Sequence, residues 1–140
     1  MRHTSVRIAL FVLQTFVALT AIDGALFVVP TLPAEWLESG PFADYTVPAM
    51  ALGLFVGGTA IAALLALLVR PALAGLASIA AGIVLIVFEL VAIAAVDSGW
   101  DEPVAWLGVL YLVIGVLGIV LGYALVRDTD ATLGQEGTAP

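Results

Sequence analysis

The sequence contains no cysteine and no lysine, and His3 is its only histidine. Without cysteine, the chain forms no disulfide, thiolate metal site or cysteine nucleophile. His3 stands close to the N-terminus, so we expect no histidine-based metal centre or general base within the apolar segments. We predict no cofactor. The net charge of -7 argues against nucleic acid as a partner, because nucleic-acid binding requires a basic surface.

Charged residues are scarce and apolar residues are abundant. They make up 11% and 63% of the chain, against about 25% and 45–50% in soluble globular domains. A helix that crosses ~30 Å of hydrocarbon needs about 20 apolar residues. Four segments meet this condition, each bounded by charge or proline: residues 6–29, 47–69, 72–96 and 103–126.

The four segments predict an all-α, polytopic membrane protein with its transmembrane helices in an up-down-up-down bundle. This transmembrane domain would occupy residues 1–127. The polar, acidic residues 128–140 cannot bury apolar area, so a disordered cytoplasmic tail is predicted there. The first segment could instead be a cleaved signal peptide. Its apolar run exceeds a 7–15-residue signal core, which favours a retained span.

The few charges predict an orientation. Basic residues occur only at the two chain ends and in the second connection: Arg2, Arg7, Arg70 and Arg127. Acidic residues occupy the first and third connections: Glu35, Glu38, Asp44, Asp97, Asp101 and Glu102. The positive-inside rule therefore predicts a multi-pass protein of the cell membrane with both termini cytoplasmic. The lipid bilayer is its first expected partner.

The outer loop, residues 30–46, has features of a membrane surface. Residues 33–38 (Pro-Ala-Glu-Trp-Leu-Glu) predict a short interfacial helix. All three tryptophans, Trp36, Trp100 and Trp106, fall at the predicted outer boundary. Anchoring in an aromatic belt is favoured over ligand recognition, because tryptophan is enriched at both membrane interfaces.

Small residues recur at helical spacing in every span. Such stripes let membrane helices approach closely. The positions predicted to pack helix on helix are Gly53, Gly57, Gly75, Ser78, Gly82, Gly108, Gly115, Gly118 and Gly122. One face of the first span carries a similar stripe with one amide. We interpret this stripe as a possible contact with a second protomer or a larger membrane complex: Gln14, Ala18, Ala21 and Ala25.

Glu89 interrupts the apolar run of residues 83–93. At 1.5 Å per residue, Glu89, Asp23 and Tyr111 each lie roughly 10–12 Å below the outer boundary, with Thr20 one turn deeper. Acidic side chains at such depth usually face the protein interior and mark function. These four residues are candidates for a ligand- or proton-binding site. We hypothesise that Glu89 and Asp23 are neutral or share a proton and hydrogen-bond Tyr111 or Thr20.

Two other interpretations of these carboxyl groups stay open. Their hydrogen bonds could simply hold helices together, with a contribution of about 0.6 kcal/mol each. Alternatively, they could form an interface with another membrane protein. No arginine lies at their depth, so none offers a counter-ion within the chain.

Most of the sequence resembles a known group. The stretches 32–37 (Leu-Pro-Ala-Glu-Trp-Leu) and 40–48 (Gly-Pro-Phe-Ala-Asp-Tyr-Thr-Val-Pro) are similar to the outer loop of uncharacterised four-helix membrane proteins common in actinobacteria. The Arg70-Pro71 turn and the Phe88-Glu89 pair also resemble that group, whereas the third loop and the tail depart from it. The resemblance implies a four-helix fold and a membrane location. It carries over no functional residue.

We therefore expect a non-enzymatic accessory, assembly or interaction protein. The alternative is a small module that binds a lipid or quinone, or conducts protons or ions, through the intramembrane carboxyl groups. An enzyme acting on lipid is least favoured, because the sequence has no nucleophile–base arrangement and no phosphate-binding loop.

Overall fold

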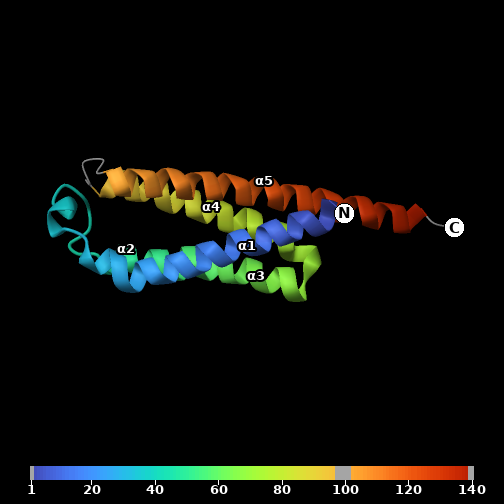
Figure 1. The fold of residues 1–140 in the computed structure, drawn as a ribbon, viewed down its shortest axis with the longest axis horizontal. Coiled ribbons are helices and arrows are strands. Elements are labelled where there is room, and N and C mark those ends of the chain that lie inside the picture. Colours follow the sequence, from blue (N-terminus) through green and yellow to red (C-terminus); the bar gives the residue numbers. More distant parts are fainter. Residues whose placement is uncertain (1, 97–101, 139–140) are drawn as a thin grey trace.

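The computed structural model describes residues 2–96 and 102–138 of the chain. Within these residues there are no strands, and four helical segments are long and apolar enough to cross a membrane. They run from Thr4 to Thr31, from Thr46 to Val69, from Pro71 to Ala95 and from Ala105 to Gly137. Successive segments run in opposite directions along one long axis (Figure 1). The predicted all-α four-helix bundle is confirmed.

The first segment is not a uniform α-helix. It comprises α1 (Arg2–Asp23), the π-helical turn η1 (Gly24–Val28) and the 3-10 turn η2 (Val29–Thr31). Pro30 lies in this last turn, and the backbone becomes extended at Leu32. Because proline supplies no backbone N–H, it commonly accompanies the end of a helix.

The second segment has the same mixed character. It begins with α2 (Thr46–Met50), widens into the π-helical η4 (Ala51–Gly57) and continues as α3 (Gly58–Val69). The two π-helical stretches face each other, because a methyl group placed on Gly24 would lie 3.0 Å from the Leu52 side chain. π-Helical turns are rare and are often found at functional sites.

The second half of the bundle is a hairpin of two long helices. Helix α4 (Pro71–Ala95) begins with proline in its first turn, where the missing N–H costs no hydrogen bond. Helix α5 (Glu102–Thr138) runs back along it (Figure 1). Their backbones are close at two levels, Gly75 with Gly122 and Gly82 with Gly115. A methyl group on Gly75 would lie 2.7 Å from the carbonyl oxygen of Gly122, and the same distance is found in the reverse direction.

The interior of the bundle contains two apolar clusters. One joins all four spans near mid-length: Val17, Ala18, Ala21, Val56, Ala60, Leu85 and Ile114. The other lies towards the N-terminal end: Leu10, Leu67, Ala74 and Leu125. Most of these side chains are small, so the helices pack closely and most large apolar side chains remain on the outer surface.

The loop between the first two spans folds over one end of the bundle. It contains the 3-10 turn η3 (Ala34–Leu37), at the place where a short interfacial helix is predicted, and its Leu37 side chain is buried. The Tyr45 hydroxyl donates a 2.7 Å hydrogen bond to the carbonyl of Pro33. Gly40 lies against the carbonyl oxygen of Ala95 at the end of α4. We call this end of the molecule the loop end, and the opposite end, with Arg7, Arg70 and Arg127, the arginine end.

The structure differs from the sequence prediction in the tail. Residues 128–138 continue α5 as helix, whereas disorder is predicted for them. This extension projects beyond the N-terminus (Figure 1), and the side chains of residues 131–137 are exposed. Local bonds accompany it, since the Thr129 and Thr132 hydroxyls donate to the carbonyls of Leu125 and Asp128. The predicted loop positions Asp97, Trp100 and Asp101 lie outside the described residues.

Candidate functional site

Glu89 lies at the junction of α4 and α5. Its side chain is partly buried, and a methyl group placed on Gly108 would lie 3.6 Å from Glu89 Oε2. Tyr111, one turn further along α5, packs against the mid-length apolar cluster. Among the described residues, no hydrogen bond joins the Glu89 carboxyl to Tyr111. The two residues therefore share the α4–α5 junction without the predicted bond.

Asp23 lies elsewhere. It is the last residue of α1, and its side chain is exposed on the outer surface of the bundle. Its neighbours on that face, Phe16 and Phe27, are 43% and 67% exposed. The hydroxyl of Thr20 donates to the carbonyl of Phe16 at 2.7 Å, within its own helix. The predicted layer is therefore not assembled in the interior, because the face of α1 that carries Asp23 points outward.

The opposite face of α1 requires a correction. Gln14, Ala18 and Ala21 are buried inside the chain, so this stripe is not available to a second protomer. Ala25, next on the stripe, packs on the second span, where a methyl group on Gly53 would lie 3.2 Å from its Cβ. The physical reason is crowding. Four helices of this length pack closely only if their small residues face one another.

Two polar side chains are buried where α1, α4 and α5 meet. Gln14 is 1% exposed and Ser78 is fully buried, and both lie next to Gly118. Neither the Gln14 amide oxygen nor the Ser78 hydroxyl has a hydrogen-bond partner among the described residues. Thr59 behaves differently, since its hydroxyl donates to the carbonyl of Phe55 one turn earlier. A buried polar group without a hydrogen bond lowers the free energy of unfolding, so we expect Gln14 and Ser78 to destabilise the bundle.

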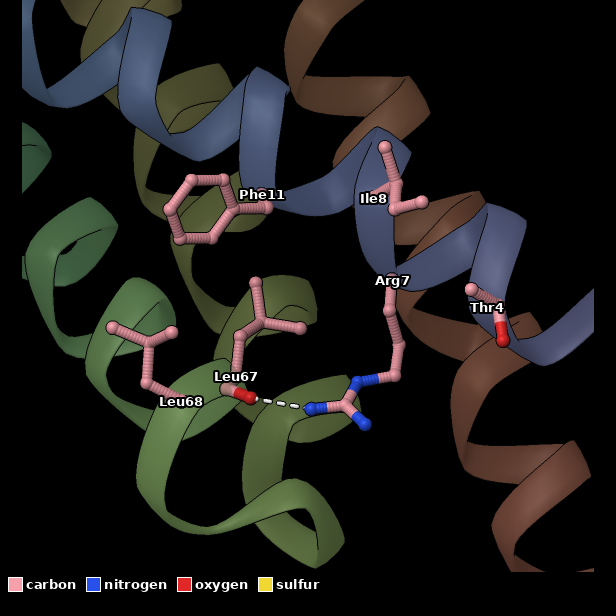
Figure 2. Close-up of a pocket in the computed structure, with 6 residues that line it drawn as sticks. All are labelled: Thr4, Arg7, Ile8, Phe11, Leu67 and Leu68. Atoms are coloured by element: carbon pink, nitrogen blue, oxygen red, sulfur yellow. Dashed lines mark hydrogen bonds between the residues drawn. The ribbon is translucent and has the colours of Figure 1, made fainter.

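A pocket opens between α1 and α3 at the arginine end, with a volume of about 300 Å³. Arg7 reaches across it, and its Nη2 donates a 2.6 Å hydrogen bond to the carbonyl of Leu67 (Figure 2). The other lining residues are Thr4, Ile8, Phe11, Leu67 and Leu68. The sequence does not predict this site, since Arg7 is interpreted there only as a marker of orientation. The available signal was a cationic side chain within the first apolar segment, residues 6–29.

The electrostatics of the outer loop are local. The backbone N–H of Thr46 donates to Asp44 Oδ1 at 2.9 Å, which lowers the pKa of that carboxyl below its usual value. Burial of the Tyr45 ring raises the pKa of its hydroxyl. Both residues fix the entry of the chain into the second span, with Asp44 binding the first turn of α2.

No group of three histidine or acidic side chains within the described ranges could hold a metal ion. The chain matches no protein-family model, no curated protein and no solved structure.

Proposed function

We propose that this chain is a multi-pass integral protein of the cell membrane, with both termini cytoplasmic, and that it acts as a non-enzymatic assembly subunit. Its partner would be another membrane protein that packs on the outward face of α1. The observation that carries this proposal is the exposed carboxyl of Asp23 on a helix of membrane-spanning length.

The energetic reason is the cost of an unpaired carboxylate in hydrocarbon. An aspartate at the centre of a transmembrane helix costs about 2.5–3.5 kcal/mol on insertion scales, and such residues are usually paired. Asp23 is eight residues from the end of its span at Thr31, or roughly 12 Å at 1.5 Å per residue. A hydrogen-bond donor or cation on a second chain would remove this cost.

The partner would supply that donor, because no side chain in residues 2–96 and 102–138 donates a hydrogen bond to Asp23. The described arginines, Arg7, Arg70 and Arg127, lie in the segments that meet at the opposite end of the bundle, around the cluster of Leu10, Leu67, Ala74 and Leu125. The Thr20 hydroxyl is bonded to its own helix. We therefore infer a partner whose membrane-spanning helix carries a lysine, an arginine or an amide at the depth of Asp23. The flanking Phe16 and Phe27 would provide the apolar part of this interface.

The test is photo-crosslinking in cells of the natural source. A photoreactive phenylalanine replaces Phe16 or Phe27 on the outward face of α1. The control position is Leu117, which is 45% exposed on α5. We expect one crosslinked protein from the two α1 positions and none from the control, and Asp23→Leu should abolish it. If the partner's span carries a basic residue, exchanging that residue with Asp23 should restore the crosslink.

The opposite result is equally clear. If Asp23→Leu leaves the crosslinks and the size of the native complex unchanged, Asp23 does not hold a partner. A crosslink to a second copy of this chain would replace the proposed partner by a homo-oligomer.

The alternative function is a ligand- or proton-binding module at Glu89. The position of its carboxyl against Gly108 in the α4–α5 junction favours this alternative. It ranks second because Asp23 and Thr20 do not join Glu89 there.

A further inference from the structure

The pocket at the arginine end combines one cation with apolar walls. We propose that it binds one anionic phospholipid, with the phosphate on Arg7 and an acyl chain along Phe11 and Leu68. This site is independent of the interface at Asp23, because it lies at the other end of the bundle and faces the groove between α1 and α3.

The guanidinium of Arg7 is held at the end of α3. The last four carbonyl groups of an α-helix have no partner within the helix, and α3 ends at Val69. The carbonyl of Leu67 is one of these, and Arg7 satisfies it. This bond ties α1 to the end of α3 and holds the planar guanidinium at the mouth of the pocket.

The guanidinium of Arg7 has further hydrogen-bond donors besides the one that binds Leu67. A guanidinium carries five N–H donors in a fixed fork and pairs with phosphate in a bidentate manner. One terminal nitrogen of Arg7 is used by Leu67, and the other lies clear of it (Figure 2). No carboxylate within the described ranges forms an ion pair with Arg7. Its charge is therefore free to meet an anion, and the exposed Thr4 on the same rim adds a hydroxyl.

The rest of the pocket is lined mainly by apolar side chains. Ile8, Phe11 and Leu68 are 60%, 42% and 66% exposed, and all three line the cavity. A free phosphate ion would use the guanidinium and leave these surfaces uncovered. A phospholipid uses both, because its phosphate lies at the level of the helix ends and its chains run down into the apolar region. The volume of about 300 Å³ is at the small end of the range for ligand pockets, and its walls stay largely exposed, so this open groove would cover only part of one lipid.

The experiment compares two arginines at the same end of the molecule. The full chain is reconstituted into nanodiscs containing phosphatidylglycerol and phosphatidylcholine in equal amounts. Native mass spectrometry then measures which lipid stays bound after the disc is stripped. Arg7→Gln should lower the preference for phosphatidylglycerol about tenfold, since a charge-assisted bidentate pair is lost. Arg70→Gln removes the same charge from an exposed position outside the pocket and should change it less than about twofold.

A second variant separates lipid binding from the structural bond. Leu68→Trp fills the pocket and leaves the bond between Arg7 and Leu67 in place, so the preference for phosphatidylglycerol should fall here too. This variant decides the matter if Arg7→Gln does not fold. Equal losses in Arg7→Gln and Arg70→Gln would mean diffuse charge attraction and overturn the proposal. An unchanged preference in Leu68→Trp would also overturn it, as would displacement of the lipid by millimolar inorganic phosphate.

Discussion

Gly82 and Gly115 face each other across the α4–α5 junction without room for a side chain on either. A methyl group on Gly82 would lie 2.6 Å from the carbonyl oxygen of Gly115, and a methyl group on Gly115 would lie 3.1 Å from the carbonyl oxygen of Gly82. Backbone atoms cannot move aside as a flexible side chain can. The two glycines therefore set how closely these helices approach.

Gly82→Ala should destabilise the bundle. The added methyl forces α4 and α5 apart, and overpacking of this kind typically costs about 1–3 kcal/mol. The free energy of unfolding in mixed detergent micelles measures this loss. Gly58→Ala is the matched control, because nothing lies within 4 Å of a methyl group there. Its stability should be unchanged or slightly higher, and an equal loss in both variants would contradict the close-packing explanation.

Ser78→Ala should leave stability unchanged or raise it by up to about 1–2 kcal/mol, because the hydroxyl is buried without a partner. Gln14→Leu, which keeps a similar volume, should behave in the same way. The same unfolding assay applies to both variants and to the double variant. A loss above about 1 kcal/mol would instead show that the amide and the hydroxyl are hydrogen-bonded in the bilayer.

Tyr45 should make the outer loop sensitive to alkali. Burial raises the pKa of its hydroxyl above the ordinary value of 10.0. The neutral form is thus favoured by the fold. The protonated Tyr45 hydroxyl contributes fully to the free energy of unfolding below the pKa of the unfolded chain. This contribution is lost as the pH rises through the pKa of the folded protein. Ultraviolet titration of the wild-type protein minus Tyr45→Phe isolates this hydroxyl, and hydrogen exchange of residues 33–45 should rise in the same pH window. Titration of Tyr45 at its ordinary value would contradict the prediction.

Deletion of residues 131–140 should change the unfolding free energy by less than about 0.5 kcal/mol, as surface changes usually do. The side chains of residues 131–137 are exposed, so the extension of α5 adds no core. Circular dichroism should show the loss of roughly two turns of helix, which distinguishes this structure from a disordered tail. A deletion that unfolds the bundle would reveal contacts of the tail.

The sequence alone predicts the spans well, since their length and apolar character are physical requirements of a bilayer. It also predicts the two faces of α1. Periodicity cannot say which face turns inward. The prediction places Asp23 inside and Gln14 outside, whereas in the structure the carboxyl is outside and the amide is inside. The π-helical turns have no sequence signature. They coincide with close contacts between spans, such as Gly53 against Ala25.

The pocket at Arg7 escapes prediction for a similar reason. It requires the end of α3 to lie beside the second turn of α1, which is a property of the packed bundle. The helical tail escapes because local hydrogen bonds from Thr129 and Thr132 accompany a helix whose composition suggests disorder.

The contact between Gly40 and Ala95 implies an order of events during synthesis. Gly40 seats against a residue that is made 55 positions later in the chain. At about 5–20 residues per second, a ribosome needs roughly 3–11 seconds to reach it. The second span and then the third are made during that interval, and until it ends Gly40 has no Ala95 carbonyl to pack against. The loop therefore completes its contact with α4 only after the third span has been made.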